Sequence, residues 1–156
     1  MKKIEWKKLI LCLAIPLLVG GLAALLSMNS FDLYDEVNKP ALAPPSWLFG
    51  VAWTILYVLM GVSSYIIFMS GSQKSRDALR IYAIQLVFNF IWPLVFFVAG
   101  AFLPAFVLLC VLWVTVLLMI NRFCSISPLA AYLQIPYLLW LTFAGYLNFM
   151  VYLLNR

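Results

Sequence analysis

The chain has 156 residues, of which 67% are hydrophobic and only 10% are charged. Ordinary soluble domains carry about 25% charged residues, so this composition excludes a soluble globular protein and indicates that a lipid bilayer surrounds the chain. The length suits one domain, and we expect a single membrane domain over residues 1–156. The net charge of +5 does not indicate nucleic-acid binding, because most basic residues flank the apolar runs.

Residue types that often carry chemistry are missing or scattered. The chain contains no histidine, which removes the commonest metal ligand, the commonest haem ligand and the usual general base. Cys12, Cys110 and Cys124 lie far apart in apolar sequence and form neither a CxxC pair nor a zinc-ligand spacing. We therefore expect no metal site and no tightly bound cofactor, and we interpret the cysteines as packing residues.

The first two apolar runs predict membrane-spanning helices at about residues 7–27 and 46–69. The first run is longer than the core of a typical signal peptide, so we interpret it as a retained helix. Its Gly20 and Ala24 form a small-xxx-small pair, which either lets another helix approach closely or is ordinary helical sequence. Between the two helices, residues 28–45 form a polar, proline-containing loop of the length that is often a functional lid.

A long uncharged run predicts two further spans. As one helix, Ile81–Asn121 would extend roughly 60 Å at about 1.5 Å per residue, twice the thickness of a bilayer core. The run must therefore fold back, and Gly100 followed by Pro104 marks the turn. The expected helices cover about residues 79–99 and 103–122.

The last polar turn precedes a fifth helix. Ser127 can cap a helix whose first position is Pro128, and the apolar sequence continues over residues 128–154 with an expected bend at Pro136. The expected fold is therefore all-α: a bundle of five transmembrane helices.

The charges predict how this bundle lies in the membrane. One side collects most of the basic residues, so the positive-inside rule places the N-terminus in the cytoplasm and the C-terminus and the first loop outside. The absence of charged residues within the apolar runs argues against proton relays, voltage sensors and ion-coupled pumps. The odd number of spans argues against two equal transporter halves. The cytoplasmic side would hold Lys2, Lys3, Lys7, Lys8, Lys74, Arg76, Arg80 and Arg122, and the other side Lys39 and Arg156.

Three helical stripes mix aromatic side chains with small or amide side chains. Such a lining suits a flat, apolar ligand that carries a few polar edges. The alternatives are that the aromatic residues only pack or anchor at the membrane interface, as we expect for Trp47 and Tyr152, and that the amides join helices. The stripes are Trp53 with Tyr57, then Asn89 with Trp92 and Phe96, and finally Trp140 with Ala144 and Asn148.

Three segments resemble one family. They are "LYDEVNKPALAPPSWLFGVAWTILYVLMG" (33–61), "NFIWPLVFF" (89–97) and "SPLAAYLQIPYLLWLTFAGYLNFMVYLLN" (127–155). They resemble the first loop and the second, third and fifth helices of the tryptophan-rich sensory protein / translocator protein family, also called the peripheral benzodiazepine receptor family. The resemblance implies a five-helix bundle, usually a homodimer, with a ligand pocket beneath the first loop.

The resemblance also implies ligands and the residues that bind them. Family members bind porphyrins such as protoporphyrin IX and haem, and many bind isoquinoline carboxamides and benzodiazepines. Trp53 and Trp140 match tryptophans proposed to mediate photochemical porphyrin degradation, so they are the candidate catalytic residues. By position, the ligand-binding residues are Tyr34, Phe49, Trp53, Asn89, Trp92, Trp140, Phe143, Ala144, Leu147 and Asn148, to which helical spacing adds Tyr57.

The sequence departs from the family pattern in two informative places. Leu42 stands where many members have a loop tryptophan, which could shift ligand preference. Phe149 stands where the animal cholesterol motif has tyrosine, so we do not expect specific sterol binding.

Three functions follow as hypotheses. The first is a porphyrin receptor or carrier that acts as a sensor or transporter. The alternatives are a light- and oxygen-dependent porphyrin-degrading enzyme, and a membrane scaffold or small-molecule exporter. The distribution of basic residues and the lack of a mitochondrial-type N-terminus favour a bacterial plasma membrane.

Overall fold

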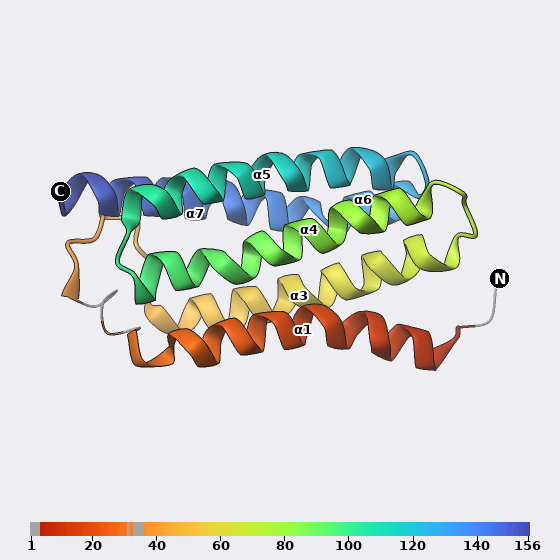
Figure 1. Cartoon of the computed structure of the whole chain (residues 1–156), viewed down its shortest axis with the longest axis horizontal. Helices are drawn as coiled ribbons and strands as arrows, with labels where there is room; N and C mark the ends of the chain where they lie inside the picture. Colours follow the sequence, from red (N-terminus) through yellow and green to blue (C-terminus); the bar gives the residue numbers. More distant parts are fainter. Residues whose placement is uncertain (1–3, 31, 33–35) are drawn as a thin grey trace.

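The computed structural model of the chain describes residues 4–30, 32 and 36–156. Helices dominate, and the described part of the chain contains no strand (Figure 1). This arrangement confirms the expected fold class, an all-α bundle of five transmembrane helices. Five segments are long and apolar enough to cross a membrane: Trp6–Ser30, Ser46–Met69, Ser75–Val98, Phe102–Cys124 and Pro128–Leu154.

The individual elements subdivide these spans. The first span is α1 (Trp6–Ser27) with a short 3-10 helix, η1 (Met28–Ser30), and the second is α3 (Ser46–Met69). The third is α4 (Ser75–Pro93) with a π-helical end, η2 (Leu94–Val98). The fourth is α5 (Phe102–Cys124), and the fifth is divided into α6 (Pro128–Tyr132) and α7 (Ile135–Leu154).

The third span starts earlier than the expected position near residue 79. The Ser75 hydroxyl donates to the carbonyl of Ile67 at 3.0 Å, which joins the first residue of α4 to the end of α3. Asp77 lies in the first turn of α4, where a carboxylate interacts favourably with the positive end of the helix dipole. These polar contacts extend the helix beyond its apolar run.

Two prolines explain the irregular helix ends. Pro93 has no backbone N–H, and beyond it the helix widens into η2, where Ala99 donates to the carbonyl of Leu94 at 3.0 Å. In the last span the break falls between Tyr132 and Ile135, one turn before the expected bend at Pro136. The proline ring clashes with the carbonyl four residues earlier, so the helix is interrupted ahead of Pro136 and restarts with it in the first turn of α7.

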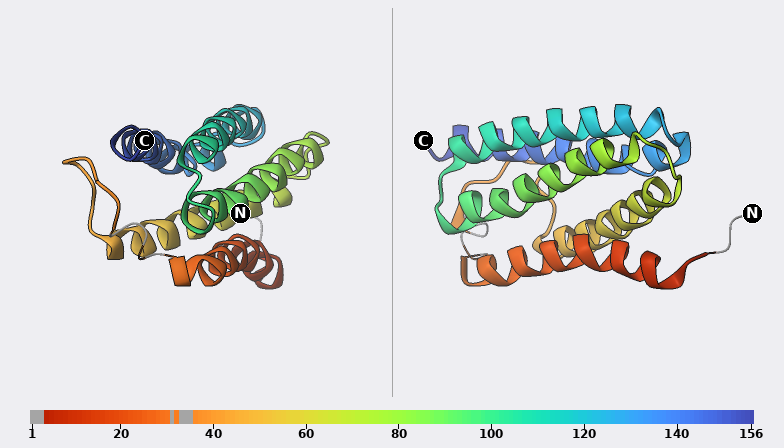
Figure 2. Two further views of the ribbon diagram at one scale, coloured as in Figure 1. Left: turned by 60° about the vertical axis from the view of Figure 1, so that its left-hand side comes forward. Right: turned by 45° about the vertical axis from the view of Figure 1, so that its right-hand side comes forward.

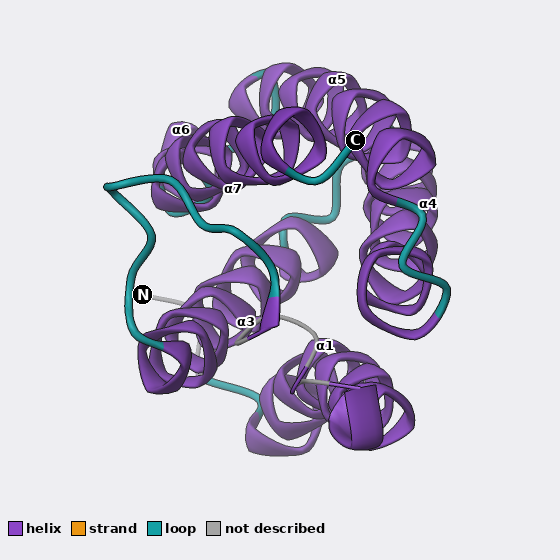
Figure 3. Ribbon diagram, turned by 90° about the vertical axis from the view of Figure 1, so that its left-hand side faces the viewer, coloured by secondary structure: helices purple, strands orange, loops and turns teal. Residues whose placement is uncertain are grey.

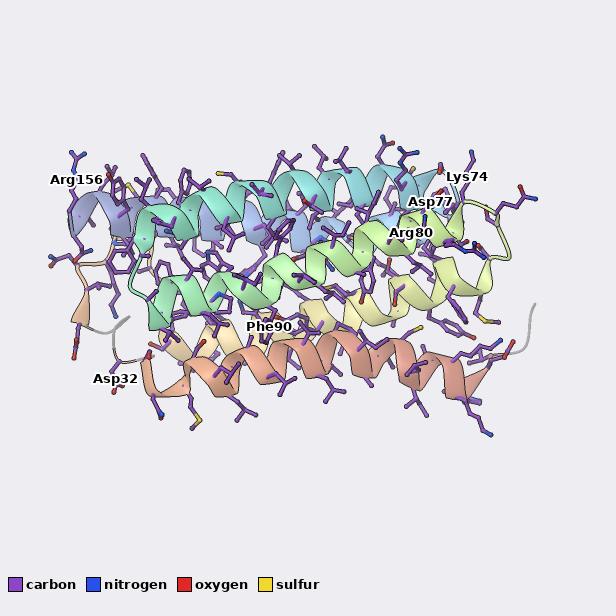
Figure 4. All side chains as sticks on the ribbon, in the orientation of Figure 1. Asp32, Lys74, Asp77, Arg80, Phe90 and Arg156 are labelled. Carbon is purple, nitrogen blue, oxygen red and sulfur yellow. The ribbon has the colours of Figure 1, made fainter. Side chains whose placement is uncertain are left out.

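The helices lie side by side along the length of the molecule. α1 packs on α3, α4 packs on α5, and α5 packs on α7, as the views in Figure 2 show. We call one end the loop end, because residues 36–45 and the C-terminus lie there. The other is the basic end, where Lys74 and Arg80 project opposite Arg156 (Figure 4).

The basic end of the bundle is closely packed. A Cβ added at Gly61 would lie 2.7 Å from the Leu13 Cα and 2.9 Å from the Cys12 carbonyl oxygen, so glycine lets α3 approach the α1 backbone. Ser63 donates from its hydroxyl to the carbonyl of Ala130 at 2.7 Å, which ties α3 to α6. The fully buried side chains here are Met60, Ile67, Val116, Met119 and Phe123.

Candidate functional site

The loop half of the bundle contains a cavity of about 440 Å³ between α1, α3 and α4. This volume lies within the usual range for small-molecule sites. Figure 3 shows these helices from the loop end, with the first loop crossing from α3 toward α7. The lining residues are uncharged: Leu17, Gly20, Gly21, Ala23, Ala24, Ser46, Trp47, Phe49, Gly50, Trp53, Thr54, Tyr57, Asn89, Trp92, Pro93 and Phe97.

One wall is an aromatic face of α3. Phe49, Trp53 and Tyr57 follow one another at intervals of four residues, so all three project from the same side of the helix. The rings of Trp53 and Tyr57 stack with centroids 5.5 Å apart and an interplanar angle of 27°. This wall offers a flat π surface to a ligand.

The opposite wall consists of small residues of α1. Gly20 faces the Tyr57 ring so closely that an added Cβ would overlap the ring atoms. Gly20 therefore admits a side chain of α3 and not a helix backbone, so close helix approach at the Gly20 and Ala24 pair stays a prediction. Gly21, whose added Cβ would meet nothing within 4 Å, leaves the wall open.

A chain of buried hydrogen bonds forms the polar side of the cavity. The Tyr57 hydroxyl donates to Asn89 Oδ1 at 2.7 Å, and Asn89 Nδ2 donates to the Tyr137 hydroxyl oxygen at 2.9 Å. Tyr137 donates in turn to Gln85 Oε1 at 2.9 Å. The last contact is weak: Gln85 Nε2 faces Met60 Sδ at 4.0 Å. The chain joins α3, α4 and α7 inside the bundle.

The contacts along this chain share one direction. Tyr57 donates to Asn89 Oδ1, and Tyr137 accepts from Asn89 and donates to Gln85. The Gln85 Nε2 facing Met60 Sδ agrees with this direction, because a thioether sulfur accepts hydrogen bonds but cannot donate them. Tyr57 therefore presents oxygen lone pairs, and not its hydrogen, to the cavity.

A second buried amide joins the cavity wall to the last helix. Trp92 Nε1 donates to Asn148 Oδ1 at 3.1 Å, and Asn148 Nδ2 donates to the carbonyl of Phe102 at 2.8 Å. The Trp92 ring also stacks on Phe96, with centroids 5.4 Å apart. These contacts fix Trp92 between α4, α5 and α7.

The predicted site residues fall into two groups. Phe49, Trp53, Tyr57, Asn89 and Trp92 line the cavity. The predicted α7 residues are not among those that line the space, although Trp140 contacts Phe49 and Asn148 accepts from Trp92. Tyr34 lies outside the described residues. The α7 group is Trp140, Phe143, Ala144, Leu147 and Asn148.

Trp140 is the α7 residue with an unused polar group. Its ring contacts Phe49 edge-on, with centroids 5.9 Å apart, and Phe143 at 5.8 Å. Its Nε1 is buried and has no hydrogen-bond partner among the described residues. An unpaired buried donor is costly in an apolar environment, and the surroundings of Trp140 leave this indole N–H unsatisfied.

Sequence reasoning missed two parts of this site. It did not assign the α1 wall, because the glycine and alanine residues within positions 20–24 are common in membrane helices. It also missed Tyr137 as the partner of Asn89 and Gln85 as the partner of Tyr137, although Gln85 and Asn89 are four residues apart and share a helical face. Among the described residues, no group of three or more His, Cys, Asp or Glu side chains could hold a metal ion.

The fold and the cavity define a class of protein: a five-helix membrane protein with an uncharged, tryptophan-rich pocket in one half of the bundle. The model of the TspO/MBR family matches residues 12–153. The chain belongs to this family.

Named relatives occur in bacteria, archaea and mammals. Protein CrtK of Rhodobacter capsulatus is 34% identical over 140 residues, covering 87% of this chain and 85% of the relative. Tryptophan-rich protein TspO of Archaeoglobus fulgidus is 36% identical over 149 residues, covering 95% of this chain and 97% of the relative. Translocator protein of Ovis aries is 36% identical over 131 residues, covering 82% and 78%. The similarity therefore extends over most of the length of these proteins.

Proposed function

We propose that the protein is a membrane receptor or carrier that binds porphyrins, such as protoporphyrin IX or haem, and related flat hydrophobic molecules in the α1–α3–α4 cavity. The observation that carries the proposal is the cavity itself, in which the Trp53–Tyr57 stack faces a wall of glycine and alanine. An extended aromatic surface opposite small residues favours a planar ligand. Isoquinoline carboxamides and benzodiazepines have the same flat, apolar character and are expected to compete.

The polar groups support one orientation of the ligand. The Tyr57 hydroxyl turns lone pairs toward the cavity, which disfavours a negatively charged propionate there. We expect the propionate edge of a porphyrin to face the loop end and the apolar edge to lie toward Tyr57. Without histidine in the chain, we expect ring stacking to dominate over metal ligation.

The test is a titration of the purified protein with protoporphyrin IX in the dark, followed by tryptophan quenching. We expect saturable binding that weakens about tenfold in Trp53→Ala. The stacking of a nucleobase on an aromatic side chain contributes roughly 1–3 kcal/mol, and we expect a similar contribution from a porphyrin ring. Trp6→Ala, at an exposed position at the far end of α1, is the matched control. Absence of saturable binding would overturn the proposal and leave the scaffold or exporter alternative.

A second candidate function is light- and oxygen-dependent porphyrin degradation. It is favoured by the position of Trp53 in the cavity wall, because an indole in van der Waals contact with a photoexcited macrocycle can donate an electron. Molecular oxygen is the required co-reactant. The test is loss of the bound porphyrin absorbance under light: Trp53→Phe and Trp140→Phe should abolish the loss while dark binding remains. Equal decay in the variants would reject this function.

We also propose the membrane setting of the protein. The basic end carries Lys7, Lys8, Lys74, Arg76, Arg80 and Arg122, which supports a bacterial plasma membrane with that end in the cytoplasm. Impermeant labelling of a cysteine introduced at Leu42 in intact cells tests this orientation. We propose a homodimer as well, which the resemblance to the family implies.

A further inference from the structure

The side chain of Asn155 fastens the first loop to the end of α7. Asn38 donates its backbone N–H to Asn155 Oδ1 at 2.9 Å, and Asn155 Nδ2 donates to the Asn38 carbonyl at 3.0 Å. The two residues are 117 positions apart in the chain. One amide thus pairs with both backbone groups of one loop residue, as a neighbouring strand would.

A third contact confirms the orientation of this amide. Asn155 Nδ2 also donates to the carbonyl of Val151 at 2.8 Å, within the last turn of α7. Exchanging the oxygen and nitrogen would direct the side-chain oxygen at two carbonyl oxygens and the NH₂ group at the Asn38 N–H. All three contacts therefore require the same arrangement, and they use both Nδ2 hydrogens.

The segment that follows Asn38 is stiff. We call residues 38–45 the strap. Ala43 donates to the carbonyl of Pro40 at 2.9 Å, which closes a turn, and Pro40 is buried. Pro45 is extended, with φ −63° and ψ 146°, and leads directly into α3. A stiff strap moves as a unit, so it can be released at Asn38 while it remains attached at α3.

The strap is continuous with the cavity wall. Ser46 and Trp47, which follow it, line the cavity, and the first loop crosses the loop end between α3 and α7 (Figure 3). We propose that Asn155 is a latch that holds the strap across the loop end, and that its release is a step in the exchange of molecules between water and the cavity. The role in ligand exchange rests on the proposed function, but the latch itself does not.

The first test is hydrogen–deuterium exchange of the full-length protein in lipid nanodiscs, without ligand. In Asn155→Leu, which has a similar volume and no amide, we expect strap amides to exchange about tenfold faster, since two hydrogen bonds of ordinary net strength are lost. Asn155→Asp should behave likewise, because a carboxylate oxygen would then face the Asn38 carbonyl. Asn38→Ala is the matched control: it keeps both backbone groups and should exchange like the wild type.

The second test measures access to the cavity without any porphyrin. A cysteine replaces Thr54, a cavity-lining residue, in a background with Cys12, Cys110 and Cys124 changed to serine, and its reaction with a water-soluble maleimide is timed. We expect Asn155→Leu to speed this reaction several-fold. The latch is overturned if strap exchange changes less than twofold or if α5 amides accelerate equally. The gating role is overturned if strap exchange accelerates but Thr54→Cys labelling does not, and a failure of protoporphyrin IX to bind affects neither readout.

Discussion

The two halves of the bundle bury their residues in different ways. At the basic end, Gly61 brings α3 against the α1 backbone, and Met60, Ile67 and Phe123 are fully enclosed. At the loop end, Gly20 receives the Tyr57 ring instead of a helix backbone, and a cavity of about 440 Å³ remains between the same helices. The two glycines thus serve different purposes on the same pair of helices.

This difference shows how a small membrane protein can keep an internal cavity. Packing drives helix association in lipid, so a bundle that is loose at both ends would not hold together. Here the close contacts gather at the basic end, and hydrogen-bonded amides such as Asn89 and Asn148 hold the loop half around its cavity. If stability depends mainly on the basic end and ligand binding on the loop end, substitutions at the two ends should change different measurements.

The largest effect is expected from Gly61→Ala. The added methyl carbon would meet the Leu13 Cα and the Cys12 carbonyl, which belong to backbone and cannot rotate away. We expect a loss of about 3 kcal/mol or more in unfolding free energy, seen as a lower midpoint in thermal unfolding of the detergent-solubilised protein. Gly21→Ala, where nothing lies within 4 Å, is the control and should unfold like the wild type. Equal thermal unfolding midpoints for the two variants would show that α3 and α1 are not closely packed at Gly61.

The next effect is expected from Asn89→Leu. The Tyr57 hydroxyl would lose its acceptor while remaining buried, and an unsatisfied buried donor costs about 1–3 kcal/mol. Adding Tyr57→Phe removes the unsatisfied hydroxyl, so the double variant should recover part of the lost unfolding free energy in a double-mutant cycle. Strictly additive losses would show that the hydrogen-bond chain does not couple these residues.

A smaller effect on stability, with a clear effect on binding, is expected from Gly20→Ala. The methyl group displaces the Tyr57 ring, which is a side chain and can move, but its stack on Trp53 and its bond to Asn89 are then disturbed. We expect affinity for protoporphyrin IX to fall about tenfold, equivalent to about 1.4 kcal/mol, while the protein still folds. Unchanged affinity would show that the position of Tyr57 does not matter for the ligand.

Much of the fold could be predicted because its signals are local. Apolar runs indicate the spans, Gly100 with φ 59° makes the expected turn, and Ser127 caps α6 by accepting from the Ala130 N–H at 3.5 Å. The start at Ser75 depends instead on a contact with Ile67 across the turn, which apolar patterning does not register.

The site was predictable only in part, for a related reason. Helical spacing indicated Trp53 and Asn89, because aromatic and amide residues stand out in an apolar sequence. The α1 wall consists of glycine and alanine, which are common in any membrane helix and carry no chemical signal. The pairing of Asn38 with Asn155 joins distant parts of the chain, and only the three-dimensional arrangement reveals it.

The smallest effect separates two tryptophans of the loop half. Trp92→Phe leaves Asn148 Oδ1 without its donor, whereas Trp140→Phe removes an indole N–H that has no partner. In the ligand-free protein we therefore expect Trp92→Phe to cost about 1 kcal/mol more in unfolding free energy than Trp140→Phe. Which of the two variants weakens protoporphyrin IX binding more depends on whether the ligand accepts a hydrogen bond from Trp140 Nε1. If it does, Trp140→Phe weakens binding although it barely changes stability, and the free donor is part of the binding site. If Trp140→Phe destabilises the empty protein as much as Trp92→Phe does, its indole N–H is satisfied within the protein and is not reserved for a ligand.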